Sequence, residues 1–435
     1  MTALINSNSL LLSIYTFWVF MHISKRLSNL TPLIEQNEIS RLQAVIESTK
    51  TADDINSLII HHCVSQADAA RMCGMSLNTF KDRVIEAKEQ GVIDDVMFES
   101  NKYLYSLGHM HALMDWMRIP KWSDKNKGNI IVNVVNQKGG TGKSTTVISL
   151  AAGIALRMNE RRRVLIIDLD PQGTLQQVTA PRLRDTDASN ELVLSAVDIM
   201  LGSEEKDSDY AQLIANDYTH QEILEYSILK THIPNLDVLP SFPTDERFSQ
   251  AAWMEYAKTG ELMHVKRLKS KIIDPLSKHY DLILIDTGPH VNPLSWSALE
   301  ACNAILVPVC PRKLDWVSTG QFLSNLPEQM SYLPSKGDNV KFFKAITVNY
   351  DEEQGRDIEM LHQIKTVLGR DVLNATIKRS SAFEAASRNY RTVFDLRKKD
   401  NLCPDRQLDK AISSLNDAIR ELLLTLEDVN FAEEN

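Results

Sequence analysis

From residue 130 onward, short apolar runs alternate with stretches whose apolar residues recur at helical spacing. The runs that predict strands lie near 130–135, 163–168, 236–240, 281–286, 303–309, 343–348 and 372–376. Strands that alternate with helices form a parallel sheet between two helical layers, and each such strand is apolar on both faces. The pattern therefore predicts an α/β fold with a mostly parallel sheet and helices on both faces, ending in an amphipathic helix over 405–428.

The pattern before residue 130 differs and predicts a separate organisation. Residues 1–60 read as N-terminal helices, with apolar positions at helical spacing over 33–60. Residues 61–120 are predicted to form a helix-turn-helix domain, in which 91–105 could supply a β-wing. The polar run KWSDKNKGN (121–129) is the predicted linker to the α/β domain, 130–435.

The helix-turn-helix prediction depends on the spacing of three residues within 65–90. Ala70 lets two helices approach, Gly74 permits the turn between them, and Phe80 fills the shared core. Ser76 would begin the second helix, because serine is favoured at helix N-termini. The side chains that this helix would present to a DNA major groove are Asn78, Thr79, Lys81 and Arg83. The alternative is an ordinary helical hairpin.

Residues 134–146, VVNQKGGTGKSTT, join an apolar strand to a helical pattern through a glycine-rich loop. In this setting backbone N–H groups and the helix N-terminus converge on phosphate oxygens. Lys143 would neutralise the β- and γ-phosphates, and the Ser144 hydroxyl would ligate Mg²⁺. Glycine is expected at position 137 of the strict pattern, where this chain has Gln137. The predicted nucleotide-binding residues are Lys138, Gly139, Gly140, Thr141, Gly142, Lys143, Ser144 and Thr145.

Two further apolar strands end in acidic residues. VLIIDLDPQGT (164–174) ends in Asp168, and Asp170 follows on the same side of an extended chain. DLILIDTGPH (281–290) ends in Asp286, the arrangement of a Walker B acid that holds Mg²⁺. Adenine recognition has no comparable motif, and the candidate is Asn349, after the 343–348 strand.

The motifs KGGTGKST, DLDPQG and LIDTGP together resemble the ParA-type partition ATPases, in the deviant Walker A group that includes MinD and the nitrogenase iron protein. The resemblance covers roughly residues 130–400. The N-terminal helix-turn-helix resembles the longer plasmid-type subgroup, whose additional domain binds operator DNA.

The resemblance implies roles for individual residues. Lys138 matches the signature lysine, which in related proteins reaches the nucleotide of the other subunit. Asp170 would orient the attacking water, and Asp168 would act in the Mg²⁺ shell. Lys138, Lys143 and Asp170 are therefore the candidate catalytic residues, while Ser144, Asp286 and Asp168 are the candidate metal-binding residues. Gln137 is also seen in such loops.

The same resemblance implies a cytoplasmic, nucleoid-associated ATPase that uses ATP and Mg²⁺ and turns over slowly. Its expected partners are a second copy of the chain, nonspecific DNA, operator DNA and a ParB-type centromere-binding protein. ATP would hold the homodimer together, and DNA and the ParB-type partner would stimulate hydrolysis. Operator binding would repress the protein's own operon.

A basic stretch near the C-terminus is the candidate surface for nonspecific DNA. Residues 377–399 contain seven Lys or Arg and two Asp or Glu, in a chain whose net charge is −9. The predicted phosphate contacts are Lys378, Arg379, Arg388 and Arg391. The alternatives are a solvated basic surface without a ligand, and a second basic patch over 264–271.

Composition narrows the function further. The five cysteines include no C-x-x-C pair, which disfavours a zinc module or an iron–sulfur reductase and indicates reduced thiols in the cytosol. The apolar run 10–21 is too short to span a bilayer at about 20 residues. No basic residue precedes it, so a signal peptide is not expected. We favour Met21 as the native initiator, in which case residues 1–20 would lie upstream of the native start.

Two other functions are alternatives to a partition ATPase. A MinD-like membrane ATPase needs a basic amphipathic tail, whereas this tail, LLLTLEDVNFAEEN, is acidic. The second rival is a nucleotide-sensing transcriptional repressor with negligible ATPase activity, and the motifs alone leave it open.

Overall fold

The computed structural model describes residues 57–99, 101–125, 128–172, 175, 193–429 and 431. Most of the predicted N-terminal helical region 1–60, including the apolar run 10–21, lies outside these residues. The described residues belong to one unit that begins at Ile55.

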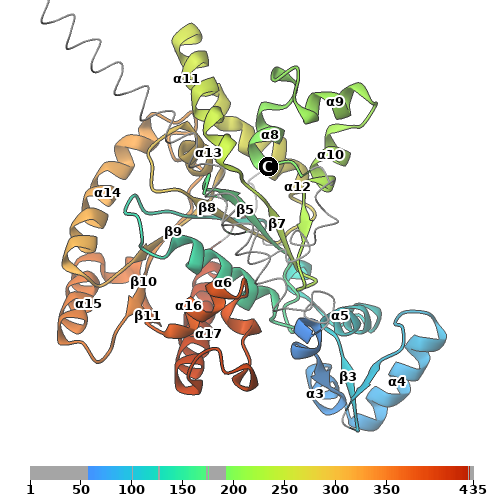
Figure 1. Cartoon of the computed structure of the whole chain (residues 1–435). Helices are drawn as coiled ribbons and strands as arrows, with labels where there is room; N and C mark the ends of the chain where they lie inside the picture. The colour runs from blue at the N-terminus through green and yellow to red at the C-terminus, as the bar shows by residue number, and fades with distance from the viewer. Residues whose placement is uncertain are drawn as a thin grey trace, which may run out of the picture. The chain divides into compact units, whose positions relative to one another are not determined.

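The described part of the chain contains an eight-stranded sheet in the order β11-β10-β9-β4-β8-β5-β7-β6 (Figure 1). Its strands are β4 (Ile130–Val134), β5 (Val164–Leu169), β6 (Leu229–Lys230), β7 (Leu236–Leu239), β8 (Leu282–Thr287), β9 (Ala304–Val309), β10 (Phe342–Tyr350) and β11 (Val372–Lys378). All neighbouring strands are parallel except β6, which pairs antiparallel with β7. The predicted α/β fold with a mostly parallel sheet is therefore confirmed. The sequence pattern missed β6, because two residues are too short to produce an apolar run.

Helices cover both faces of this sheet. One face packs against α6 (Lys143–Ala155), α16 (Ser381–Arg388) and α17 (Asp405–Glu427). The core on the other face includes side chains of α8 (Ala196–Leu201), α9 (Asp209–Ala215), α10 (His220–Tyr226), α11 (Arg247–Thr259), α12 (Asp274–Leu276), α13 (Pro293–Ala301), α14 (Lys313–Ser331) and α15 (Gly355–Leu368). Alternate residues of β4 enter opposite cores: Val132 belongs to the first, and Ile131 to the second. This explains why the central strands read as continuous apolar runs.

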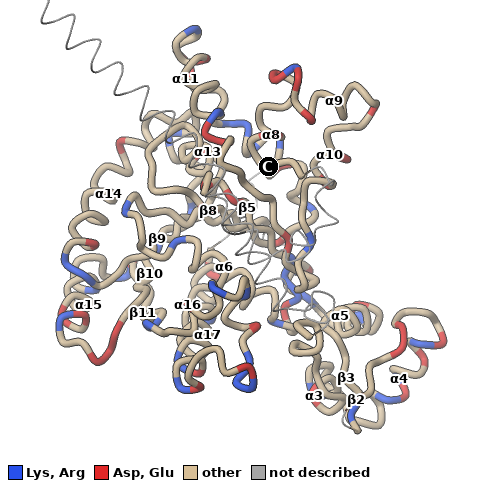
Figure 2. The backbone as a smooth tube through the Cα atoms, viewed as in Figure 1, with Lys and Arg blue, Asp and Glu red and all other residues tan. Residues whose placement is uncertain are grey.

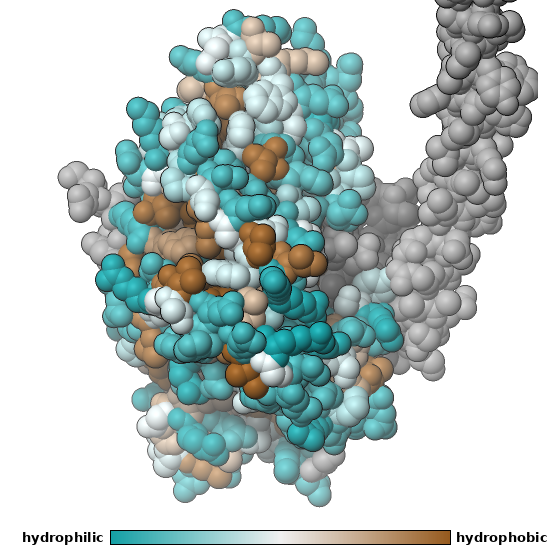
Figure 3. All heavy atoms as spheres, turned by 90° about the vertical axis from the view of Figure 1, so that its left-hand side faces the viewer, coloured by the Kyte–Doolittle hydropathy of each residue, from teal (hydrophilic) through white to brown (hydrophobic). Residues whose placement is uncertain are grey.

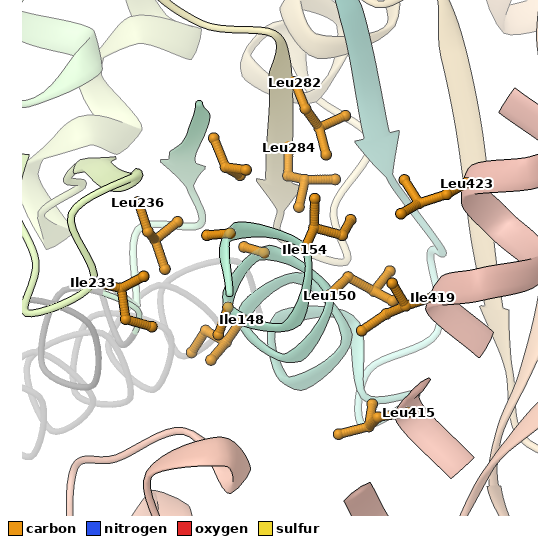
Figure 4. Close-up of a cluster of buried hydrophobic side chains, with 14 of the residues drawn as sticks. Ile148, Leu150, Ile154, Ile233, Leu236, Leu282, Leu284, Leu415, Ile419 and Leu423 are labelled. Carbon is orange, nitrogen blue, oxygen red and sulfur yellow. The ribbon is translucent and has the colours of Figure 1, made fainter. Parts of the chain in front are cut away.

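Helix α6, which follows the glycine-rich loop, lies between the sheet and α17 (Figure 4). Leu150 and Ile154 of α6 pack in a cluster with Leu284 of β8 and Ile419 of α17. All four side chains are fully buried, so the packing fixes the helix whose N-terminus forms part of the loop.

Gly153 is the point at which α6 has no room for a side chain. A Cβ built there would collide with Ile419 Cδ1 and lie 2.8 Å from Phe394 Cζ. Alanine in a helix interior is normally more stable than glycine by about 1 kcal/mol, whereas overpacking costs about 1–3 kcal/mol. We expect Gly153→Ala to lower the free energy of unfolding by about 1 kcal/mol in urea denaturation. The matched control is Gly320→Ala on α14, where nothing lies within 4 Å of the built Cβ, and it should be neutral or stabilising. An equal gain in both variants would contradict the close packing of α6.

The N-terminal part of the described chain contains two helices joined by a tight turn. Its elements are β1 (Val64–Ser65), α3 (Gln66–Met72), α4 (Leu77–Glu89), β2 (Met97–Glu99), β3 (Lys102–Tyr105) and α5 (Leu107–Trp116). The strands form an antiparallel sheet in the order β1-β3-β2. Gly74 has φ +68° in the turn between α3 and α4, a conformation that favours glycine. Ser76 caps α4 by accepting the Thr79 N–H, and Phe80 is fully buried against Tyr105.

The segment after α5 contacts the α/β domain closely. Trp122, within the polar run predicted as a linker, is buried, and the Arg162 guanidinium lies 4.6 Å from its ring centroid. Arg162 is itself fully buried and pairs with Glu427 of α17 at 3.2 Å. Arg161 pairs with Asp115 of α5 at 3.3 Å and donates to the Ile119 carbonyl. The arginines before β5 thus hold the end of the N-terminal part.

The side of the molecule that carries α14 and α15 shows apolar residues interspersed among hydrophilic ones (Figure 3). The exposed apolar side chains on these helices are Leu314, Val317, Ile358 and Val367. Apolar residues scattered over a surface in this way are ordinary. In the described part of the chain, no helix has the length and apolar character needed to cross a membrane.

Candidate nucleotide site

The glycine-rich loop lies between the carboxyl end of β4 and the N-terminus of α6. Gly140 and Gly142 have φ of +75° and +78°, so these two positions favour glycine for conformational reasons. Residue 137 is not among the positive-φ residues, and therefore the backbone does not require glycine there. The Gln137 side chain instead donates to Gln329 Oε1 of α14 at 3.3 Å.

The Asn136 side chain links the start of the loop to β9 and α14 through hydrogen bonds, a role that the sequence did not indicate. Its Nδ2 donates to the Pro308 carbonyl and to Thr319 Oγ1, both at 2.9 Å, and its Oδ1 accepts the Lys138 N–H at 3.0 Å. Asn136 is fully buried. A buried amide with three hydrogen bonds fixes the start of the loop, because breaking any of them would leave a buried polar group unpaired.

The two lysines of the loop have different surroundings. Lys143 is buried, with 6% of its surface exposed, and burial lowers its pKa while Asp286 and Asp170 oppose that shift. Lys138 is half-buried, and among the described residues its side chain forms no ion pair. Lys143 is therefore the loop lysine that is buried near the acidic groups of this chain, whereas Lys138 forms no ion pair within the described residues.

Two carboxylates meet at the ends of adjacent strands. The register of β5 and β8 places Asp168 opposite Asp286, and both residues are fully buried. Burial raises the pKa of Asp286 to about 7, although the Ser144 hydroxyl lowers it, and burial together with Asp286 raises the pKa of Asp168. Within the described residues, Asp168 Oδ2 and both Asp286 oxygens lack a hydrogen-bond partner of normal geometry. Unpaired carboxylate oxygens beside a hydroxyl form a donor set that suits Mg²⁺.

Asp170 faces the same region from the end of β5. Its Oδ1 accepts the Gln172 N–H at 3.1 Å, and its carbonyl accepts the Ser241 hydroxyl at 2.6 Å. A Cβ built on Gly288, in the turn after β8, would lie 3.5 Å from Asp170 Oδ1. The carboxylate therefore packs against this turn, where glycine leaves room for it.

Two clefts meet at the glycine-rich loop. The first, of about 440 Å³, is lined by the loop, Lys143, Ser144, Asp170 and the turn at Pro289 and His290. The second, of about 680 Å³, extends from the loop towards Asn349 at the end of β10 and includes Ser380 and Phe383. Gly140, Gly142 and Thr145 line both. Phosphates over the loop would thus have carboxylates on one side and room for a nucleoside on the other.

The basic stretch 377–399, which begins within β11, is largely compensated by acidic neighbours. Lys378 pairs with Glu352 at 2.6 Å and Arg379 with Asp351 at 3.9 Å, and both basic residues line the second cleft. Lys, Arg and acidic segments lie together around β11 and α15 (Figure 2). The alternating signs limit the local positive potential that the sequence suggested.

The remaining two candidates of this stretch differ in exposure. The Arg388 side chain is 80% exposed and lies 3.6 Å from Glu384. Arg391 is buried, with 9% of its side chain exposed, and pairs with Asp400 at 3.4 Å. Arg391 consequently lacks the exposure that a phosphate contact needs.

The alternative basic patch is also paired within the chain. Arg267 pairs with Glu204, Lys269 with Asp274 at 2.5 Å, and Lys271 donates to the Met200 carbonyl at 2.8 Å. These contacts make the 264–271 patch a weaker candidate for DNA.

The four candidate DNA-contacting residues of the predicted helix-turn-helix are all exposed on α4. Asn78, Thr79, Lys81 and Arg83 lie away from the face that buries Phe80, Val84 and Ala87. Thr79 Oγ1 lies 2.8 Å from Ser76 Oγ, and Arg83 pairs with Glu86 at 2.7 Å.

A strand, a glycine-rich loop and a helix, with acids at the ends of adjacent parallel strands, define a P-loop nucleoside triphosphatase fold. Residues 129–332 match the family model described as an AAA domain. The chain is 25% identical over 351 residues to plasmid partition protein A of Escherichia coli, covering 79% of this chain and 83% of the relative. It is 30% identical over 179 residues to chromosome partitioning protein ParA of Myxococcus xanthus, covering 41% of this chain and 51% of the relative. This chain therefore carries a ParA-type P-loop ATPase domain and is related to the plasmid partition proteins.

A solved structure named Partition Protein has the same fold. It matches this chain with a TM-score of 0.60 at 19% identity, over 87% of this chain and 95% of that one. The similarity in fold thus extends over most of the chain.

Proposed function

We propose that this protein is a DNA-partition ATPase. It would form a homodimer when it binds ATP and bind DNA as that dimer, and ATP hydrolysis would separate the two chains and release the DNA. The observation that carries the proposal is the contrast between the two loop lysines. Lys143 is buried close to the acidic residues of its own site, whereas Lys138 has no ion-pair partner among the described residues. A cation supplied from a second chain would stabilise phosphate charge only when two chains meet.

The residues of the site divide the chemistry between them. Loop N–H groups and the Lys143 ammonium would hold the β- and γ-phosphates. Asp170 would accept a hydrogen bond from the water that attacks the γ-phosphorus as its bond to the ADP oxygen breaks. Ser144, Asp286 and Asp168 would hold Mg²⁺, which when bound neutralises charge on the phosphates. Asn349 would lie near the base, since it lines the second cleft.

Neutralising Lys138 is expected to prevent pairing without preventing nucleotide binding. Lys138→Ala should weaken ATP-dependent dimerisation at least about tenfold, the size of effect that loss of one charge-assisted contact of 1.5–3 kcal/mol produces. Sedimentation velocity at micromolar protein, with Mg²⁺ and a non-hydrolysable ATP analogue, measures the effect. Lys206→Ala removes the same charge from an exposed position elsewhere and should pair normally. Pairing of Lys138→Ala at the wild-type concentration would contradict the role of this lysine.

Two modes of DNA binding belong to the proposal. Helix α4 would read an operator through Asn78, Thr79, Lys81 and Arg83, because these side chains are exposed beside one another. The dimer would hold nonspecific DNA through exposed basic residues, of which Arg388 is the best placed and Lys378 and Arg379 are partly compensated. Added salt should weaken the second mode steeply, since phosphate neutralisation releases counterions.

The cellular role follows from these modes. The protein would associate with the nucleoid in the cytoplasm and position a ParB-type protein bound to its centromere. Operator binding would regulate expression of its own operon.

The second candidate function is a nucleotide-sensing repressor with negligible hydrolysis, favoured by the exposed polar face of α4. ATP turnover measured alone, with DNA, and with DNA plus a ParB-type protein separates the two. Stimulation by DNA and the partner supports the partition ATPase. Undetectable turnover in every mixture, together with operator binding that responds to nucleotide, would favour the repressor.

A further inference from the structure

Three segments that are distant in the sequence bring two histidines and an aspartate together away from the nucleotide site. His62 precedes β1, His232 lies between β6 and β7, and Asp395 ends the short helix η9 (Val393–Asp395). His62 Nε2 and His232 Nε2 lie 2.7 Å and 2.8 Å from the same oxygen, Asp395 Oδ1. All three ligand atoms lie within 4.8 Å of one another.

The cluster is buried and its carboxylate is fixed in orientation. The side chain of Asp395 is fully buried, that of His232 is 2% exposed, and that of His62 is 9% exposed. Asp395 Oδ2 accepts the Thr392 N–H at 2.8 Å and the Thr392 hydroxyl at 2.7 Å. These two hydrogen bonds leave Oδ1 facing the imidazoles, as neighbouring groups commonly orient a metal-binding carboxylate.

The other histidine nitrogens near the cluster leave Asp395 Oδ1 to His62 Nε2 and His232 Nε2. His232 Nδ1 is buried and has no hydrogen-bond partner within the described residues. The adjacent His61 does not compete for Asp395, because its Nε2 lies 3.0 Å from the Phe394 carbonyl.

We propose that His62 Nε2, His232 Nε2 and Asp395 Oδ1 bind one divalent transition-metal ion, for which Zn²⁺ is the best fit. Imidazole and carboxylate ligands suit Zn²⁺, which accepts such atoms at about 2.0–2.2 Å and takes four ligands in a tetrahedron. The Asp395 oxygen and the imidazole nitrogens would separate by a few tenths of an ångström to admit the ion. Water would occupy the fourth position, because the described residues supply three ligand atoms.

The expected effect of this ion follows from the segments that it joins. His62 belongs to the N-terminal part of the described chain, His232 to the edge of the sheet, and Asp395 to the connection between α16 and α17. The neighbouring Phe394 packs near Gly153 of α6, the helix that begins at the glycine-rich loop. Bound metal would therefore stabilise the folded chain where these parts meet, in proportion to its occupancy.

Equilibrium Zn²⁺ binding to the full chain tests the proposal. A chromophoric chelator would compete for Zn²⁺ in saturating Mg²⁺ and reductant, so that Mg²⁺ occupies the oxygen ligands of the nucleotide site. We expect one Zn²⁺ per chain, with affinity lowered at least about tenfold in both His62→Gln and His232→Gln, since ligand loss should match or exceed the 10–100-fold effect of losing an outer partner. Cys63→Ser and His362→Ala are the controls, because Cys63 is next to the cluster without belonging to it and His362 is exposed on α15.

Thermal unfolding supplies a second measurement that does not depend on the chelator. Zn²⁺ should raise the Tm of the wild type and of both controls and leave the Tm of His62→Gln and His232→Gln unchanged. Nucleotide binding by the two histidine variants shows that they are folded. The proposal is overturned if the wild-type chain binds no stoichiometric Zn²⁺, if folded histidine variants bind it equally well, or if Cys63→Ser abolishes binding.

Discussion

Asp170→Ala is expected to lower ATP turnover by about 100-fold or more, within the range by which a positioned acid or base accelerates proton transfer. The variant should still bind ATP, because Lys143, Ser144 and Asp286 are unchanged. Asp170 differs from the two fully buried acids in being partly exposed and in lining the cleft beside the loop. We therefore expect the ATP-bound dimer to persist on DNA.

Single-turnover hydrolysis and binding of a fluorescent ATP analogue measure the two halves of this expectation. Asp170→Asn is the matched variant, since its amide oxygen can still accept the Gln172 N–H while the charge is lost. If the carboxylate acts on the water, both variants should hydrolyse slowly and bind ATP normally. Wild-type turnover in Asp170→Ala would remove Asp170 from the mechanism.

Lys143→Ala is expected to weaken nucleotide binding by about 100-fold or more, which corresponds to at least about 2.7 kcal/mol. The ammonium is buried close to Asp286 and Asp170, so the substitution removes a cation from a site that otherwise holds acidic groups. The remaining carboxylates would then repel the phosphates, and a buried charge left without its partner is costly.

Isothermal titration calorimetry with Mg²⁺ and ATP measures this loss. Lys206→Ala, which changes the net charge equally from an exposed position, should bind ATP as the wild type does. Circular dichroism before titration checks that Lys143→Ala is folded. Affinity within threefold of the wild type would exclude Lys143 as the main phosphate contact.

The central strands and the loop could be predicted because their signals are local. Apolar runs over β4, β5 and β8 end in the groups that form the site, and the parallel register then places Asp168 beside Asp286. Gln137 was an apparent departure from the loop pattern, and the structure explains it, since only Gly140 and Gly142 have positive φ in the loop.

What the sequence could not predict depends on partners far along the chain. Asn136 is bonded to residues more than 170 positions away, and His62 meets Asp395 across 333 positions. The sequence of 377–399 revealed the positive charge of this stretch, but not that acidic residues after β10 pair with Lys378 and Arg379. Burial of Arg391 likewise depends on the packing around Asp400 rather than on its own neighbours.

If α4 reads operator DNA as proposed, the contacts of Trp122 and Arg161 restrict how two copies of α4 can meet one duplex. Because they anchor the end of α5, pairing of two ATPase domains would also set the separation between two copies of α4. B-DNA presents the same face about every 10–10.5 base pairs. An operator lengthened by half a turn between its repeats would direct one copy to the wrong side of the duplex, and a full-turn insertion would restore the phase.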